Sequence, residues 1–237
     1  MPKDLRSPTQ RKPRLPQPSD LSILYLDNHL IAVYKPPGLL TQADDSGSES
    51  LVGQVKKWIK LEYKKPGNVF LGLVHRLDRN VSGVVLFART SKAASRLSEQ
   101  FRKKTINKVY RTTVEGIPNP KETTLTHYLR KEKSLKSTVF NRPEKDTQQA
   151  ELEYKTLENR KTSSLLEVRL RTGRFHQIRA QLSFIGHPIL GDKKYGSTIT
   201  LPDRQIALYA HQLVFEHPIN KEKVCLETLP PSHWPID

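Results

Sequence analysis

The residues best suited to chemistry lie in the segment 75–83, which reads HRLDRNVSG. Its one acidic residue, Asp78, is surrounded by His75, Arg76 and Arg79. An apolar run follows directly and predicts a buried strand, so we expect Asp78 at the edge of a sheet. Cations this close keep a carboxylate ionised even when it is partly removed from water. Such a carboxylate can act as a nucleophile or a general base; the simpler alternative is a structural ion pair at the start of the strand.

A second group of polar residues lies on a helix predicted over residues 174–185, which begins at Arg174. Helical spacing puts positions 176, 179 and 183 on one stripe, beside an apolar stripe of positions 175, 178, 182 and 185. We therefore expect His176 and Arg179 to flank the core-facing side and to point toward a neighbouring site. For either residue alone, an ordinary solvated position on the helix is the alternative.

The segment KVYR, residues 108–111, adds a tyrosine to a predicted strand over residues 109–114. A tyrosine on a strand is commonly part of a core or an interface. In a basic cleft, Tyr110 would also offer a flat ring on which an unpaired base can stack. Lys108 would add positive charge beside that ring.

The charge of the whole chain indicates the kind of partner. The 237 residues contain 40 Lys and Arg against 24 Asp and Glu, a formal net charge of +16. The sequence pI is about 9.9. A cation this strong favours a polyanionic partner, and nucleic acid is the commonest one. The 35% hydrophobic content still allows a sizeable core.

Cysteine content and hydropathy exclude two other classes. Cys225 is the single cysteine, so the chain has neither an internal disulfide framework nor a multi-cysteine zinc site. No apolar run exceeds five residues, whereas a membrane helix needs about 20. We expect a reducing, cytoplasmic compartment.

Residues 1–20 differ from the rest of the chain. They hold five of the 17 prolines and five cations among only three apolar residues, without the apolar segment of a secretory signal. Such a composition predicts a disordered basic tail, with a weak electrostatic arm for RNA as the alternative. We expect residues 21–237 to form one catalytic domain.

The remaining elements are strands and helices without strict alternation. Predicted strands cover residues 23–26, 30–33, 84–88, 109–114, 166–170, 206–215 and 224–229. Predicted helices begin after Ser50 and at Thr90 or Ser91, and a third covers 174–185. This pattern favours an α+β fold with a central mixed, mostly antiparallel sheet flanked by helices.

Five segments in the same order make the sequence resemble the RluA-type pseudouridine synthases. They are KPPG at 35–38, HRLDRNVSG at 75–83, KVYR at 108–111, TGRFHQIR at 172–179 and GHPILGDKKYG at 186–196. The segments LYAHQLVFEHP from Leu208 and ETLPPSHW from Glu227 also look like the closing strands of the family. The resemblance covers about residues 21–234. Two departures are visible: Val81 replaces the usual threonine, and Tyr209 stands where a histidine is common.

The resemblance implies roles for individual residues. Asp78 would be the catalytic aspartate, Tyr110 would contact the target uracil, and Arg179 would pair with Asp78. Arg76 would help to hold the target nucleotide out of its stack. The other candidates for substrate binding are His75, Arg79, Lys108, Arg174 and His176.

The activity that follows is the isomerisation of specific uridines in tRNA or rRNA to pseudouridine by a monomeric enzyme that needs neither cofactor nor metal. Because the 20 residues before the predicted domain cannot hold the small RNA-binding domain of many relatives, we expect the catalytic domain to choose the target. A catalytically silent basic RNA-binding protein with the same fold is the alternative. A glycoside hydrolase would need a second carboxylate about 5–10 Å from the first, and these motifs predict no acidic partner for Asp78.

Overall fold

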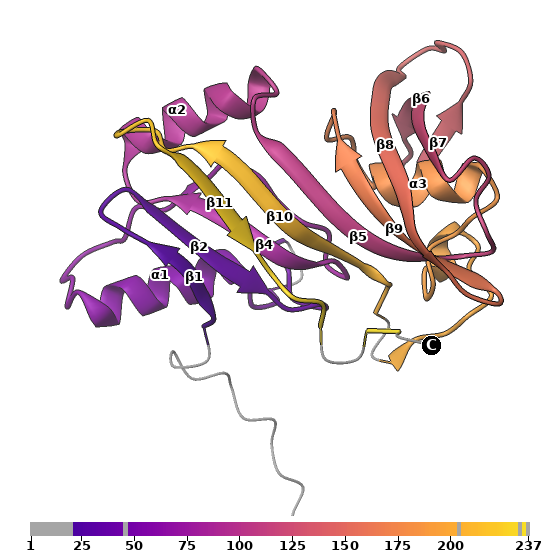
Figure 1. Ribbon diagram of the computed structural model, residues 1–237. Helices are drawn as coiled ribbons and strands as arrows, with labels where there is room; N and C mark the ends of the chain where they lie inside the picture. The colour runs from indigo at the N-terminus through magenta and orange to yellow at the C-terminus, as the bar shows by residue number, and fades with distance from the viewer. Residues whose placement is uncertain (1–20, 45–46, 203–204, 232–233, 236–237) are drawn as a thin grey trace, which may run out of the picture.

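An eleven-stranded sheet connects the elements of the described chain (Figure 1). The computed structural model describes residues 21–44, 47–202, 205–231 and 234–235; the predicted tail, residues 1–20, lies outside them. The strands are β1 (Ile23–Leu26), β2 (Leu30–Lys35), β3 (Gly72–Leu73), β4 (Ser82–Ala88), β5 (Asn107–Glu115), β6 (Glu122–Lys131), β7 (Ser137–Phe140), β8 (Gln148–Asn159), β9 (Ser163–Leu170), β10 (Leu208–Glu216) and β11 (Lys223–Glu227). The helices of this part are α1 (Leu51–Glu62), α2 (Ser91–Arg102), α3 (Gln177–Phe184) and the 3-10 helix η2 (Lys193–Tyr195).

The sheet is mixed and mostly antiparallel. Its strands lie in the order β1-β2-β4-β10-β5-β9-β8-β6-β7, with β3 beside β4 and β11 beside β10. Among these described strands only β4 and β10 pair in parallel. The predicted α+β class is therefore confirmed, and the strands predicted at 23–26 and 30–33 pair antiparallel as β1 and β2.

Strand β4 is buried along its whole length because a helix covers each of its faces. Successive side chains of a strand point to opposite faces. Val85 packs in one cluster with Val55 of α1, whereas Val84 packs in another with Leu97 of α2. This two-sided cover explains the continuous apolar run in the sequence.

The predicted starts of the first two helices are confirmed by side-chain caps. The Oγ of Ser50 accepts a hydrogen bond from the N–H of Gly53, and the Oγ1 of Thr90 accepts one from Ala93. Each bond satisfies one of the free N–H groups at a helix start. In the described residues, no helix is both long and apolar enough to cross a membrane.

Gly83 allows β4 to approach β10 closely. Its φ is +117°, and a Cβ at this position would lie 2.3 Å from the carbonyl oxygen of Ala210. A residue with a side chain would therefore push the two strands apart. Because Gly83 closes the HRLDRNVSG segment, this contact helps to fix where the preceding loop lies against the centre of the sheet.

Helix α3 is shorter than predicted. The prediction began the helix at Arg174, but the structure begins it at Gln177, and His176 before it has a left-handed φ of +52°. The expected stripe through positions 176, 179 and 183 is therefore wrong for His176, which lies in the turn. The side chain of Gln177 holds this turn closed, because its Oε1 accepts hydrogen bonds from the N–H of Arg174 and the hydroxyl of Thr172.

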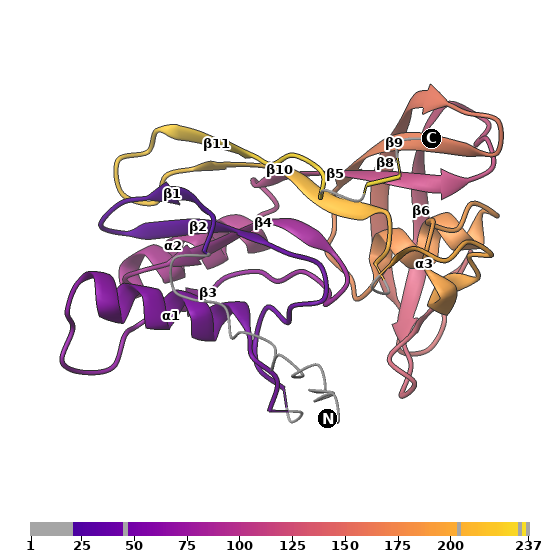
Figure 2. The same cartoon turned by 90° about the horizontal axis from the view of Figure 1, so that it is seen from below.

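Strands β6, β7 and β8 form the end of the sheet against which α3 lies (Figure 2). None of the elements predicted from the sequence covers residues 122–159. Helix α3 contacts both β6 and β7, and the cluster there joins Ala180 to Leu129 and Tyr195. By packing against α3, these strands fix the position of its polar residues, such as Arg179.

Candidate active site

The loop that carries Asp78 connects β3 to β4 and is held by the chain that follows β2. Thr41 makes two hydrogen bonds to Leu77, the residue before Asp78: its Oγ1 accepts from the Leu77 N–H at 3.2 Å and donates to the Leu77 carbonyl at 2.8 Å. Both Thr41 and Leu77 are buried. The backbone next to Asp78 is thereby fixed from one side.

Lys35 holds the same loop from the other side of Asp78. Its Nζ donates to the carbonyl oxygens of Pro36, Leu39 and Arg79 at 2.9, 2.8 and 3.0 Å. Three carbonyls match the three N–H groups of an ammonium. Burial lowers the pKa of Lys35 to about 7, against the opposing effect of the negative charge of Asp78. The KPPG segment is therefore a clamp on the Asp78 loop.

Arg179 lies between two carboxylates. Its Nη1 is 3.2 Å from Oδ2 of Asp78, while its Nε and Nη2 donate to the two oxygens of Asp192 at 2.7 and 2.9 Å. Burial opposes the charge of Arg179, but the hydrogen bonds and charge of Asp192, together with Asp78, raise its pKa. Asp192 thus fixes the guanidinium that contacts Asp78.

His176 makes the second side-chain contact to Asp78. Its Nε2 is 3.5 Å from Oδ2 of Asp78, and its Nδ1 is 3.0 Å from the hydroxyl of Tyr195. That hydroxyl accepts the N–H of Ser137 at 2.7 Å, so its own proton is free to go to Nδ1. Burial lowers the pKa of His176 to about 4, against the charge of Asp78. If the Tyr195 hydroxyl donates to Nδ1, the proton of the neutral ring lies on Nε2, the nitrogen that faces the carboxylate.

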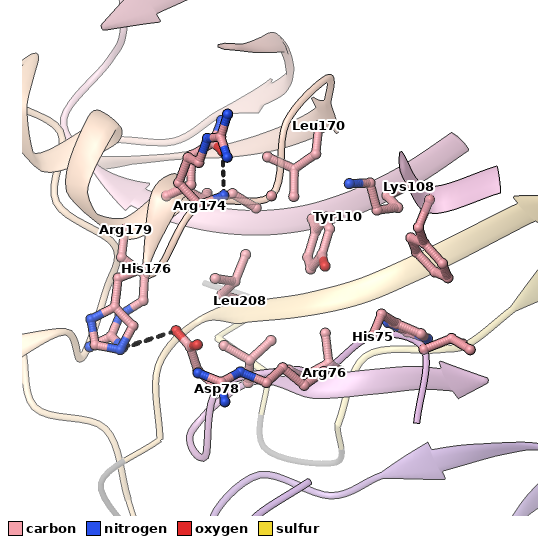
Figure 3. A pocket seen from close by; sticks show the side chains of 17 residues that line it. His75, Arg76, Asp78, Lys108, Tyr110, Leu170, Arg174, His176, Arg179 and Leu208 are labelled. Atoms are coloured by element: carbon pink, nitrogen blue, oxygen red, sulfur yellow. Dashed lines mark hydrogen bonds and ion pairs between the residues drawn. The ribbon is translucent and has the colours of Figure 1, made fainter. Parts of the chain in front are cut away.

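Asp78 faces a cavity of about 370 Å³ (Figure 3). Asp78 and Arg76 lie on one wall, His176 and Arg179 at one end, and Tyr110 on the opposite wall, where it projects from β5. Burial, and then the charge of Asp78, raise the pKa of Tyr110, so its hydroxyl stays protonated. Leu170 and Leu208 add apolar side chains to the lining of the cavity beside the Tyr110 ring.

Most of the predicted substrate-binding residues line this cavity. They are His75, Arg76, Lys108, Arg174 and His176. Arg79 does not: its Nε donates to the carbonyl oxygen of Gly38, and it borders a neighbouring cavity.

His75 is committed to the fold, since its Nε2 accepts the N–H of Leu86 at 2.9 Å and its ring stacks on Phe101. Burial lowers its pKa to about 4. In contrast, Arg76 is exposed, and its side chain makes no hydrogen bond or ion pair within the described residues.

Asp192 and Tyr195 were not predicted as site residues, although both lie in the segment GHPILGDKKYG. The expectation that these motifs hold no acidic partner near Asp78 is wrong, because Asp192 shares the guanidinium of Arg179. Asp192 is only 1% exposed and both of its oxygens bind Arg179, so it cannot reach a sugar. A glycoside hydrolase would still lack its second reacting carboxylate. Within the described part, no group of three or more His, Cys, Asp or Glu side chains could hold a metal ion.

The fold and the cavity correspond to one class of protein. Residues 29–184 match the family model described as RNA pseudouridylate synthase. The chain belongs to this family and is a pseudouridine synthase, an isomerase, as the resemblance to the RluA-type enzymes predicted.

Individual relatives agree with this assignment. The chain is 32% identical over 214 residues to the uncharacterized RNA pseudouridine synthase YhcT of Bacillus subtilis, covering 90% of this chain and 70% of the relative. It is 32% identical over 219 residues to ribosomal large subunit pseudouridine synthase D of Zymomonas mobilis, covering 88% and 69%. The solved structure of human RNA pseudouridylate synthase domain containing 4 matches with a TM-score of 0.77 and 25% identity, over 90% of each chain.

Proposed function

We propose that this pseudouridine synthase isomerises specific uridines of tRNA or rRNA, and that Asp78 is the reacting carboxylate. The observation that carries this proposal is the placement of Asp78. Its Oδ2 contacts Arg179 and His176, while its side chain, 27% exposed, faces a cavity opposite Tyr110. Residues 21–237 would form the catalytic domain.

The reaction rearranges atoms that the uridine already contains. The N-glycosidic bond between C1′ and N1 breaks, the detached uracil turns, and a bond forms between C1′ of the sugar and C5 of the base. C5 then loses its proton and N1 gains one, so the atoms balance. A carboxylate at Asp78 can start this sequence by attacking the sugar or by taking a proton from it. Since substrate and product are isomers, no hydride, phosphate or metal is required, and we propose activity without any cofactor.

The other cavity residues suit a nucleotide that has left its stack. Extruding a base costs a few kcal/mol, and stacking on an aromatic ring recovers about 1–3 kcal/mol for each base. Tyr110 offers that ring beside Asp78. Arg76, whose side chain has no hydrogen bond or ion pair in the described residues, can contact the phosphates or fill the space that the extruded base leaves in its stack.

Arg179 and His176 have supporting roles in this proposal. The guanidinium of Arg179, 3.2 Å from Oδ2, sets a positive charge against the negative charge of the carboxylate. A neutral His176, with its Nε2 3.5 Å from the same oxygen, contacts Asp78 without neutralising its charge. Both contacts leave the second oxygen of Asp78 free to approach the sugar.

The RNA target is the second part of the proposal. The name of the relative from Zymomonas mobilis assigns that protein to the large ribosomal subunit, which makes rRNA the first RNA to test, followed by tRNA. Pseudouridine should be mapped at single-nucleotide resolution in total RNA from cells with and without this protein.

Purified protein should then restore each lost site on the RNA from the deficient cells, in the presence of a chelator and without added nucleotide. We expect at least one uridine to be modified only when the protein is present. RNA binding without any pseudouridine would instead support the catalytically silent RNA-binding protein, and a strict need for added metal or NAD would contradict the mechanism.

A further inference from the structure

A second cavity, of about 480 Å³, lies on the other side of Asp78. It shares a wall with the first cavity, formed by Arg76, Leu77, Asp78, His176 and Arg179. Asp78 therefore lies on the boundary between two spaces. The far side of the second cavity is formed by the chain around Gln42, the end of β6, the β6–β7 turn and η2.

Cations from separate elements converge on this second cavity. Lys131 comes from the end of β6, Lys194 from η2, and Arg76 from the Asp78 loop. All three residues are exposed, and none of their side chains forms an ion pair or hydrogen bond within the described residues. The Nζ of Lys131 lies 4.9 Å from the ring centre of Phe175. No hydrogen bond or ion pair of these three side chains therefore has to break when an anion binds.

The two cavities differ in the part of a nucleotide that they suit. The first is lined by the ring of Tyr110 and by the apolar side chains of Leu170 and Leu208, which match a base. The second presents Lys131 and Lys194, which match phosphates, because phosphate contacts in RNA complexes come mainly from Lys and Arg. Asp78 on the boundary lies where a sugar would connect base and phosphate.

We propose that the second cavity binds the phosphodiester backbone next to the target uridine, with Lys131 and Lys194 as its phosphate contacts. This inference rests on the proposed function, since it requires the sugar of the target uridine to lie at Asp78. If the base lies in the first cavity and the sugar lies at Asp78, the phosphodiester backbone attached to that sugar has to run through the second cavity. Tyr110 does not line the second cavity. The two lysines therefore hold the sugar at the carboxylate through contacts that are separate from the contact of the base with Tyr110.

The test uses full-length protein and short stem-loop RNAs that contain one uridine modified by the parent. One set carries the natural backbone, and the others carry a neutral methylphosphonate at a single linkage on either side of that uridine. The variant is Lys131→Gln with Lys194→Gln. The matched control is Lys60→Gln with Lys223→Gln, two exposed lysines that border neither cavity.

On the natural RNA we expect the Lys131/Lys194 variant to raise KM several-fold with little change in kcat, because its phosphate contacts are made equally before and during the reaction. The slope of log affinity against log salt should become shallower by about 1.4, at 0.7 for each phosphate contact. The control variant should change neither quantity by as much.

The modified RNAs give the decisive comparison. For the parent, one or two linkages should weaken binding when made neutral, whereas the Lys131/Lys194 variant should be insensitive at those same linkages. Equal losses for parent and variant at every linkage would overturn the proposal, as would a variant indistinguishable from the control. Binding is measured independently of turnover. A parent that modifies the RNA but binds it equally well with every linkage made neutral would contradict this proposal alone, whereas an Asp78→Asn protein that still modifies the RNA would contradict the proposed function.

Discussion

Asp78 and Asp192 contact the same guanidinium in different ways. Asp192 takes two hydrogen bonds from Arg179 and is buried, whereas Asp78 takes one and remains 27% exposed. The buried carboxylate therefore holds the arginine in place, and the exposed one is left available for substrate. Removing the arginine affects both carboxylates at once.

We expect Arg179→Ala to destabilise the fold as well as to abolish most activity. Asp192 would be left as a buried charge without a partner, which typically costs about 3–5 kcal/mol. Urea unfolding at pH 7 measures this loss. The double variant Arg179→Ala with Asp192→Ala should recover part of the stability without recovering activity. A single variant that loses less than about 1 kcal/mol would show that Asp192 does not depend on Arg179.

The lowered pKa of His176 predicts that stability depends on pH. The folded value is about 4, compared with 6.5 for an unperturbed ring. Between these values the unfolded chain binds a proton that the folded chain does not, so stability is full above pH 6.5 and falls as pH decreases toward 4. The expected slope is about 1.4 kcal/mol for each pH unit in this range. His176→Gln should reduce the slope of unfolding free energy against pH by that amount; an unchanged slope would contradict the buried, neutral ring.

The candidate residues were predictable from sequence only where a local pattern marks them. Asp78 stands among adjacent cations, so its segment was found from residue types alone. Asp192 and Tyr195 act through partners 13 to 58 positions away, Arg179 and Ser137. No periodicity connects such positions, because their contact depends on the turn before α3 and on the fold of the distant β7.

At the scale of elements, the Asp78 loop is held by hydrogen bonds on both sides rather than by regular structure. Thr41, in the chain after β2, binds Leu77, and Lys35, the last residue of β2, binds Arg79. The residues before and after Asp78 are therefore both anchored to this part of the chain. A loop anchored in this way places its central side chain accurately while leaving it partly exposed.

Thr41→Val should therefore reduce kcat more than the same substitution of a buried threonine elsewhere in the chain does. The substitution leaves the buried N–H of Leu77 without its acceptor, at a cost of about 1–3 kcal/mol. Thr228→Val is the matched control, because Thr228 is also buried and donates to the carbonyl oxygen of Ala210. Pseudouridine formation at saturating RNA, measured well below the unfolding temperature, should fall for Thr41→Val and stay near the parent value for Thr228→Val. Equal kcat values for both variants would contradict the anchoring role.

The elements themselves were predicted unevenly. The buried strand at 84–88 and the capped helices after Ser50 and Thr90 have clear local patterns and are confirmed. The start of α3 was wrong because the left-handed His176 and the side chain of Gln177 stop a helical pattern that continues in the sequence. Strands in residues 122–159 were missed, and in β6 and β8 exposed residues outnumber buried ones, which weakens the apolar signal.

For the whole molecule, the net charge of +16 and the cavities around Asp78 point to the same partner. An RNA strand brings one negative charge with every phosphate, so its attraction acts over the entire surface and weakens with salt. Only the few contacts at the cavities can select a particular uridine. Affinity and catalysis should therefore respond to different parts of the chain.

Removal of residues 1–20 tests this separation. It takes away five cations and two acids, which lowers the net charge from +16 to +13. We expect weaker RNA binding and a shallower dependence of affinity on salt, with kcat at saturating RNA nearly unchanged. Affinity titrations at several salt concentrations measure the first effect, and a loss of turnover at saturation would show that the tail is part of the site.

Substitution of Asp78 by asparagine tests the central claim most directly. The change preserves the shape of the side chain but removes the charge and the reacting oxygen. We predict that Asp78→Asn stays folded, binds RNA at least as tightly as the parent because one anion has left a cationic cleft, and forms no pseudouridine. Pseudouridine formation at saturating RNA, measured beside affinity and thermal midpoint, is the decisive measurement. A folded Asp78→Asn protein that modifies RNA at the parent rate would contradict the account.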